Sequence, residues 1–138
     1  MEKVHDAKPE SINRAVMWAV SRGYILNSTV QTHKDNLKKW IDNRPDWFAI
    51  ENKVIVERTM MTKEHGVTRQ YRADRIIHRP DGKMIVIDYK FGERNDEKYI
   101  AQVRRYMRLI QSVYGNRISS VEGFVWYVET DDAVSVAL

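Results

Sequence analysis

The sequence predicts an α/β protein in which helices pack against a mixed β-sheet. Three observations lead to this class. Apolar residues up to position 42 recur at helical spacing, and from position 53 to 90 the period becomes that of strands. A further helical segment then separates these strands from a β-rich C-terminal part. The predicted order of elements is therefore α α β β β α β β, without internal repeats or long linkers.

The N-terminal part is predicted to contain two amphipathic helices. In the first, apolar residues over 12–20 lie three and four positions apart, with Ser11 as the candidate N-cap and Gly23 as the residue that ends the helix. The second is predicted over about 29–42, where apolar residues form one stripe and most lysines lie off it. These two helices precede every predicted strand.

Three strands are predicted next, and a turn over 80–83 folds the third back beside the second. Residues 84–87 are apolar on both faces, which is typical of a central strand. A helix follows, and the connection through it to the next strand is long enough for a parallel crossover, so a mixed sheet is expected. The predicted strands are 53–61, 69–78, 84–90, 121–129 and 134–137, and the helix is 97–115.

Composition favours one domain over residues 1–138, helical over 1–50 and built of the sheet and its helix over 51–138. The chain is 43% hydrophobic and 30% charged, and its net charge of +4 is compatible with a polyanionic partner without being specific for one. The absence of cysteine excludes disulfides, thiolate zinc sites and a cysteine-held iron–sulfur cluster. With no signal-peptide pattern and no membrane-spanning run, a cytoplasmic protein is expected.

Acidic residues near the ends of two neighbouring strands form the most informative pattern. If the turn is centred on Asp81, paired residues have an index sum of 162 and Asp74 faces Asp88; a full four-residue loop gives 163 and places Asp74 opposite Tyr89. Asp88 and Lys90 project from one face in either case, while Tyr89 points away and its backbone carbonyl could be a ligand.

Two carboxylates beside a lysine are suited to a divalent metal and to phosphodiester hydrolysis. The alternative is that the aspartates simply form ion pairs with Arg72, Arg75 or Lys90 on a solvated sheet face. The apolar flank over 84–87 favours the metal site, because unpaired charges are costly on a central strand.

Further candidates lie on the first strand and on the helix after Lys90. Glu57 could supply a third carboxylate, although its position next to Arg58 equally fits a surface ion pair. Gln102 and Tyr106 share one helix face and could hydrogen-bond a phosphate or a ligating carboxylate, but spacing alone favours an apolar core stripe for Tyr106. The helix also has a basic flank that fits either solvent or a nucleic-acid backbone, formed by Arg104, Arg105 and Arg108.

Taken in chain order, four short segments resemble successive motifs of the PD-(D/E)xK nuclease superfamily, and most nearly its RecB-like branch. Within that branch, residues 71–127 resemble the C-terminal nuclease domain of helicase–nuclease proteins of the UvrD/Rep and AddA type, which are ATP-dependent exonucleases. The segments that carry the resemblance are Glu57, 72–75, 87–92 and 102–106.

The resemblance implies a restriction-endonuclease-like αβββαβ core and a metal-dependent deoxyribonuclease, the exonuclease part of a helicase–nuclease in DNA repair and recombination. Asp74 and Asp88 would bind Mg²⁺ or Mn²⁺, with the Tyr89 carbonyl as a further ligand. Lys90 would position or activate the attacking water, and Glu57 would assist the metal or the water. Residues implied to support the site or the DNA are Gln102, Tyr106, Arg72 and Arg105.

One feature departs from the RecB-like pattern. That branch usually has a metal-binding histidine, preceded by glycine, upstream of the first strand, and none of the four histidines here has this context. The chain therefore resembles the end of a larger protein. It also has no GxxxxGK phosphate loop, so any ATP site would belong to a helicase portion. The expected partners are DNA and that helicase portion, with no membrane and no small-molecule substrate.

Two other functions remain compatible with the sequence. The first is a module that retains the nuclease fold and binds DNA, or docks to a helicase, without cleaving. Asp74, Asp88 and Lys90 argue for the nuclease, because a purely binding role does not need two carboxylates that repel phosphate. The second is a stand-alone restriction-type endonuclease, which would require a dimer surface or a target-recognition insert.

Overall fold

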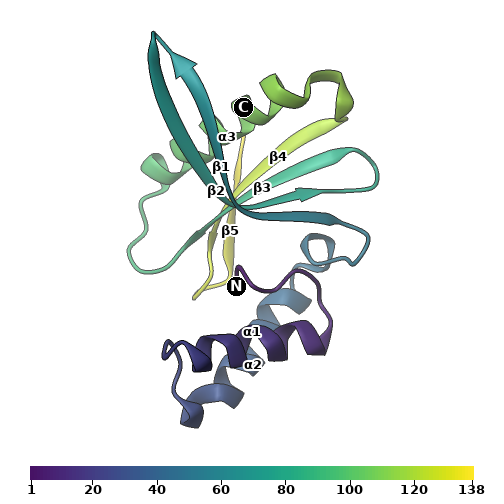
Figure 1. Cartoon of the computed structure of the whole chain (residues 1–138), viewed down its shortest axis with the longest axis vertical. Coiled ribbons are helices and arrows are strands. Elements are labelled where there is room, and N and C mark those ends of the chain that lie inside the picture. The colour runs from purple at the N-terminus through teal and green to yellow at the C-terminus, as the bar shows by residue number, and fades with distance from the viewer. The chain divides into compact units, whose positions relative to one another are not determined.

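A computed structural model describes all residues from Met1 to Leu138. The chain divides into two compact units, Met1–Asn52 and Lys53–Leu138, and each is described by itself (Figure 1). The predicted order of helices and strands is confirmed. The prediction of a single domain stays a prediction. No helix combines the length and the apolar character needed to cross a bilayer.

The N-terminal unit contains α1 (Pro9–Ser21) and α2 (Val30–Asp42), together with the short 3-10 turns Asn27–Thr29 and Pro45–Trp47. Both predicted helices are confirmed. Their apolar faces supply much of the buried surface of this unit. The buried apolar residues of the unit are Val4, Ile12, Ala15, Val16, Ile41, Trp47 and Phe48.

The start of α1 differs from the prediction. Ser11 is not the N-cap but lies inside the helix, because Pro9 has a φ suited to the first turn and begins it earlier. Lys8 occupies the N-cap position without a side-chain cap. The Ser11 hydroxyl is buried and donates instead to Asp6 Oδ1, at 2.6 Å.

The C-terminal unit is a five-stranded sheet in the order β1-β2-β3-β4-β5. Only β3 and β4 pair in parallel, and α3 (Asp96–Tyr114) connects them as the predicted crossover. The mixed sheet and the central position of the apolar strand are therefore confirmed. The strands are β1 (Lys53–Glu64), β2 (Val67–His78), β3 (Lys83–Lys90), β4 (Ser120–Tyr127) and β5 (Asp132–Val136).

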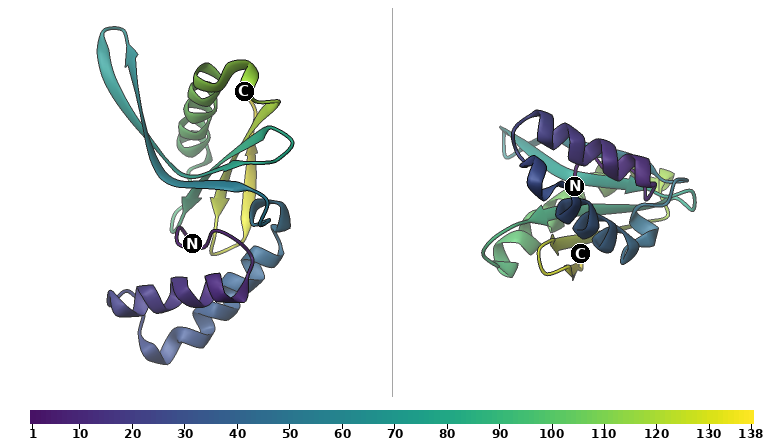
Figure 2. Two further views of the ribbon diagram at one scale, coloured as in Figure 1. Left: turned by 45° about the vertical axis from the view of Figure 1, so that its right-hand side comes forward. Right: turned by 90° about the horizontal axis from the view of Figure 1, so that it is seen from below.

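The β1–β2 hairpin is longer than predicted. Its pairing continues to Glu64 and Val67 around a two-residue turn, His65-Gly66, in which both residues have positive φ. Figure 2 shows that the far part of the hairpin extends beyond the other strands. Apolar alternation does not predict this part of the hairpin, because its residues are mostly polar. Pairing between the two strands, and not burial, stabilises it.

Helix α3 packs along one face of the sheet. Asn95 caps its N-terminus by accepting a hydrogen bond from the Lys98 amide at 3.2 Å, and two acidic residues follow in the first turn. Its buried side chains join those of the strands in one apolar core. Residues of this core are Ala73, Ile76, Met84, Val86, Val103, Tyr106, Met107, Ile110, Val125, Tyr127 and Val136.

Gly123 on β4 allows α3 to approach the sheet closely. A Cβ there would overlap Met107 Sδ and lie 2.7 Å from Val103 Cγ1. We expect Gly123→Ala to lower the free energy of unfolding by about 1–3 kcal/mol, because the helix must shift or repack. Urea denaturation measures this, with Ser135→Ala at an exposed position of β5 as the control. Equal stability of the two variants would show that the core accommodates the methyl group.

Candidate active site

The predicted acidic pair lies where β2 separates from β3. The bridges between these strands run from His78–Met84 to Arg75–Ile87, all with an index sum of 162. Continued by one residue, this register places Asp74 opposite Asp88, as the shorter loop predicts, although these two residues form no bridge. The alternative sum of 163 is not observed. Beyond this point β3 continues to pair with β4 while β2 continues into the hairpin.

Asp88 is buried, with only 2% of its surface exposed. Lys90 Nζ lies 2.7 Å from Asp88 Oδ2, so the two side chains share a face of β3 as expected. The contact lacks hydrogen-bond geometry, and Oδ2 has no hydrogen-bond partner. The ion pair with Lys90 is one that the solvated-surface alternative also predicted, but the burial of Asp88 does not fit that alternative.

Asp74 is held by the backbone of the neighbouring strand. Its Oδ2 accepts a hydrogen bond from the Tyr89 amide at 2.8 Å. Burial raises the pKa of Asp74 to about 7; the Tyr89 amide opposes this shift, and the charge of Asp88 and a hydrogen bond with its carboxyl group add to it. The two carboxyl groups are therefore close enough that their joint ionisation is unfavourable near neutral pH.

The side chain of Tyr89 is buried away from the acidic pair. Its hydroxyl accepts a hydrogen bond from Arg75 Nη1 at 3.4 Å, and its ring lies edge-on to Trp126. This agrees with the predicted alternation along β3. The role of the Tyr89 carbonyl as a ligand stays a prediction.

Glu57 does not join the two aspartates. In the β1–β2 register it lies opposite Asp74, between the bridges Val56–Arg75 and Arg58–Ala73, but it forms no bridge itself. Its side chain forms an ion pair with Arg72, not with Arg58 as the surface alternative proposed. No group of three or more His, Asp or Glu side chains is arranged to hold a metal ion.

The backbone at Glu57 changes the direction of the hairpin. Glu57 has φ 51°, in the left-handed region that is rare for residues other than glycine. Ile55 packs on the core under α3, and so does Met60, although an odd number of positions separates them. Across the ladder Ile76 and Ala73 show the same inversion. The alternation of the hairpin thus inverts beside Asp74, where the strained residue lies.

The positive φ of Glu57 predicts that two substitutions at this position differ in stability. Glu57→Gly and Glu57→Ala both remove the ion pair with Arg72, but only glycine adopts φ 51° without steric cost. We expect the glycine variant to be the more stable by about 1–2 kcal/mol in urea denaturation. Equal stabilities would mean that residue 57 does not have a left-handed conformation in solution.

Gln102 and Tyr106 connect α3 to the acidic pair. Gln102 Nε2 donates to the Tyr106 hydroxyl at 2.8 Å. Burial raises the pKa of Tyr106, and the charges of Asp88 and Asp74 add to the shift, which places the phenol near both carboxylates. The ring also belongs to the core and lies edge-on to Tyr71. The packing of Tyr106 in the core stripe is therefore confirmed. Its role in binding a phosphate or a ligating carboxylate stays a prediction.

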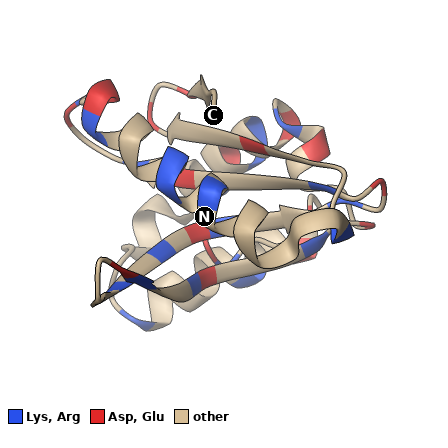
Figure 3. Cartoon of the chain, turned by 90° about the horizontal axis from the view of Figure 1, so that it is seen from above, with Lys and Arg blue, Asp and Glu red and all other residues tan.

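The basic flank of α3 divides into two parts. Arg104 Nε donates to the Ala137 carbonyl at 2.8 Å. Arg105 and Arg108 instead line a hollow of about 360 Å³ against the hairpin, together with Tyr71. Arg72 is occupied by Glu57. Basic and acidic residues are interspersed along the three helices and along β1, β2 and β3 (Figure 3).

Tyr99 contacts Lys90, which the sequence did not predict. Lys90 Nζ lies 4.4 Å from the centroid of its ring, a distance suited to a cation–π interaction. The ammonium is thus placed between Asp88 and an aromatic ring. No spacing rule connects the end of a strand with a residue of the following helix, so only the three-dimensional packing shows this contact.

Comparison with protein-family models and with curated proteins gave no match. The class is therefore stated from this chain alone. It is an α/β protein with a five-stranded mixed sheet, in which an acidic pair and a lysine meet where two strands diverge.

Proposed function

We propose that this chain is a metal-dependent DNA nuclease domain that hydrolyses phosphodiester bonds. The observation that carries the proposal is the pairing of the Asp74 and Asp88 carboxyl groups where β2 leaves β3, with the Lys90 ammonium beside them. This set unites negative oxygen ligands with a cation that can face a phosphate. Acidic pairs on a solvated sheet are not expected to be buried in this way.

The donor set fits a divalent metal that prefers oxygen. Asp88 Oδ2 is buried without a hydrogen bond, and burial next to another carboxyl group raises the pKa of Asp74 to about 7. A cation would relieve the repulsion, and Mg²⁺ or Mn²⁺ matches carboxylate oxygens. Asp74 and Asp88 would hold it, with the Tyr89 carbonyl as a further ligand. When bound, such a metal lowers the pKa of a coordinated water and stabilises charge on a phosphate.

The remaining residues of the site act through charge and hydrogen bonds. The Lys90 ammonium, fixed between Asp88 and Tyr99, would offset negative charge that develops on the scissile phosphate. The Tyr106 hydroxyl, held by Gln102, lies near both carboxylates and would orient a ligating carboxylate or a phosphate oxygen. The Glu57 carboxylate would have to break its ion pair with Arg72 before it could assist the metal or the attacking water.

The wider assignment rests on the sequence resemblance and on the order of the elements. The run α2, β1, β2, β3, α3, β4 has the αβββαβ order of the restriction-endonuclease-like core. In the RecB-like assignment this unit is the exonuclease part of a helicase–nuclease that acts in DNA repair and recombination. ATP-driven unwinding would then belong to a helicase portion, and the substrate of this chain is DNA.

A second candidate function is DNA binding or helicase docking without cleavage. The ion pair between Glu57 and Arg72 favours it, because this pair keeps a third carboxylate away from the metal position. The two functions differ in whether Mn²⁺ produces cleavage. They share the fold and the basic residues of α3.

Calorimetric titration with Mn²⁺ tests the nuclease proposal on the full chain. We expect the wild type to bind, Asp74→Asn and Asp88→Asn to lose binding, and Asp35→Asn on α2 to bind as the wild type does. Cleavage of single- and double-stranded DNA is then measured with Mn²⁺. Absence of Mn²⁺ binding to the wild type, or its retention in both site variants, would contradict the metal site. Mn²⁺ binding with DNA binding but no cleavage would favour the second candidate.

A further inference from the structure

A hollow of about 360 Å³ lies between α3 and the projecting part of the β1–β2 hairpin, within the C-terminal unit. Figure 2 shows α3 beside this part of the hairpin. The volume is at the lower end of the range of small-ligand sites, so it suits a compact group such as a phosphate with its sugar. Both walls supply polar side chains, which are Thr62, Glu64 and Tyr71 from the hairpin and Arg105, Arg108 and Ser112 from α3.

Two arginines of α3 give the hollow its positive charge. Arg105 and Arg108 are three positions apart, so they are neighbours on one face of the helix, and both are exposed. Neither forms an ion pair or a hydrogen bond with the rest of the chain. Ser112 lies about one turn beyond Arg108 and adds a hydroxyl group to the same wall. Two guanidinium groups so close together are suited to one anion.

The one carboxylate of the hollow is already engaged by the hairpin. Glu64 Oε1 accepts a hydrogen bond from the Tyr71 hydroxyl at 2.9 Å, and Glu64 Oε2 lies 3.3 Å from Arg69 Nε. Arg69 thus offsets the charge of Glu64. The hydrogen bond with Glu64, above all, raises the pKa of Tyr71, and the charge of Arg105 opposes this shift, which places Arg105 near the hairpin wall. The net charge of the hollow is therefore positive.

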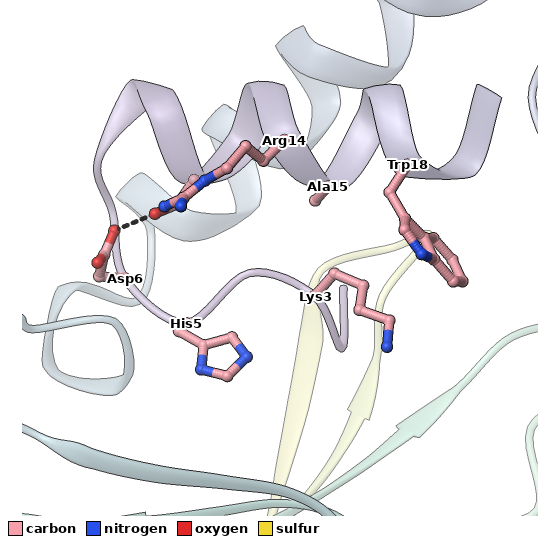
Figure 4. Close-up of a pocket in the computed structure, with 7 residues that line it drawn as sticks. Lys3, His5, Asp6, Arg14, Ala15 and Trp18 are labelled. Carbon is pink, nitrogen blue, oxygen red and sulfur yellow. Dashed lines mark hydrogen bonds between the residues drawn. The ribbon is translucent and has the colours of Figure 1, made fainter. Parts of the chain in front are cut away.

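The larger hollow of the N-terminal unit lacks this arrangement (Figure 4). There Arg14 lies toward Asp6 at one end, and Lys3 lies toward Trp18 at the other. The Lys3 ammonium is 4.8 Å from the centroid of the indole ring. Cations at opposite ends do not hold one anion together. The arginines of α3 differ because less than one helical turn separates them.

The hollow beside α3 adjoins the candidate active site. Tyr71 lines the hollow, and its ring lies edge-on to that of Tyr106, with 6.0 Å between the ring centroids. The Tyr106 hydroxyl lies near the carboxyl groups of Asp74 and Asp88. Tyr71 also precedes Asp74 by three positions of β2, which corresponds to about 10 Å along a strand. Nearby phosphates of one DNA strand could therefore reach both places.

We propose that this hollow binds a backbone phosphate of the DNA on which the acidic pair acts, away from the scissile bond. Arg105 and Arg108 donate charged hydrogen bonds to the phosphate oxygens, and the hydroxyls of Ser112 and Thr62 flank them. Such a contact positions the strand without reading its bases. The proposal rests on the proposed function, because it takes DNA as the substrate. The phosphate could belong to a single strand or to a duplex.

Titration of a labelled oligonucleotide with the full chain in EDTA tests this hollow without cleavage, followed by fluorescence anisotropy. The hollow variant is Arg105→Gln/Arg108→Gln, and Arg105→Lys/Arg108→Lys retains the charge. The control, Lys34→Gln/Lys39→Gln, removes the same charge from α2. All four positions are at least partly exposed, so folding should be retained, and circular dichroism checks this.

We expect the hollow variant to bind the oligonucleotide about tenfold or more weakly than the wild type, because it loses charged hydrogen bonds to a phosphate. The slope of the logarithm of affinity against the logarithm of salt concentration should fall by about one, as for one lost phosphate contact. The lysine variant should recover part of the affinity, and the control should bind as the wild type does. No DNA binding by the wild type, or an equal loss in the hollow variant and the control, would overturn the proposal.

Cleavage with Mn²⁺ separates this proposal from the nuclease assignment. We expect the hollow variant to raise KM far more than it lowers kcat, because the contact is made in the ground state and the transition state alike. DNA binding that depends on the two arginines, without any cleavage, would support the hollow and contradict the nuclease. Cleavage with unchanged DNA affinity in the hollow variant would overturn the hollow alone. A larger loss of affinity for a single strand than for a duplex would identify the single strand as the ligand, and the reverse would identify the duplex.

Discussion

Replacing Lys90 with methionine is expected to lower DNA cleavage by about 10²–10³-fold without weakening Mn²⁺ binding. The ammonium lies 2.7 Å from Asp88 Oδ2 and would face the charge that develops on the phosphate. Its removal leaves the acidic pair more negative, which favours a cation at the carboxylates. Methionine retains much of the aliphatic length of lysine, so packing against Tyr99 is least disturbed.

Two measurements on one preparation decide the role of Lys90. Calorimetry gives the Mn²⁺ affinity, and single-turnover cleavage of a labelled oligonucleotide gives the chemical rate. Lys98→Met, at the start of α3, is the matched control, since this lysine also lies near the Tyr99 ring, at 5.9 Å. If Lys90→Met lost metal binding and cleavage to the same extent, the lysine would act by organising the carboxylates and not by stabilising charge on the phosphate.

Asp74→Asn is expected to stabilise the metal-free protein above neutral pH but not near pH 4. The pKa of Asp74 is raised from 3.8 to about 7, chiefly by burial. A raised pKa contributes stability that is fully present below the unfolded value and is lost as the pH rises through the folded value. The wild type therefore loses stability between about pH 4 and pH 7. Asparagine has no charge to bury, and its side-chain oxygen can still accept the hydrogen bond from the Tyr89 amide.

The shift corresponds to about 4 kcal/mol at most, and partial exposure and the second carboxylate reduce the expected gain to about 1–3 kcal/mol. Urea denaturation in EDTA near pH 4 and near pH 8 measures it, with Asp35→Asn as a surface control. Added Mn²⁺ should reverse the order near pH 8 by stabilising only the wild type. An Asp74→Asn protein less stable than the wild type at both pH values would show that the carboxylate stabilises the fold without a metal.

Much of the fold could be predicted because it follows from local patterns. The apolar run over 84–87 defined the central strand, and the turn at Asp81 set the register that brings Asp74 opposite Asp88. The predicted start of α1 was wrong, because Ser11 is a strong capping residue in isolation and was given more weight than Pro9, which starts the helix earlier.

The candidate site shows where sequence patterns become insufficient. The proximity of the Asp88 and Lys90 side chains follows from alternation along one strand and could therefore be predicted. The left-handed backbone of Glu57 could not be predicted, since a glutamate within an apolar strand gives no indication of a positive φ. The surface alternative paired Glu57 with its neighbour Arg58, whereas Arg72 on the adjacent strand forms the ion pair.

The hydrogen bond from the Tyr89 amide to Asp74 has a consequence for how the sheet ends. Where β2 diverges, this amide of β3 loses its place in the ladder between the two strands, and the aspartate side chain replaces the missing carbonyl. One carboxyl group thus closes the seam between the strands and contributes half of the acidic pair. A sequence that abandoned the acidic pair would still need a hydrogen-bond acceptor at position 74, which makes asparagine the least disruptive replacement there and alanine a costly one.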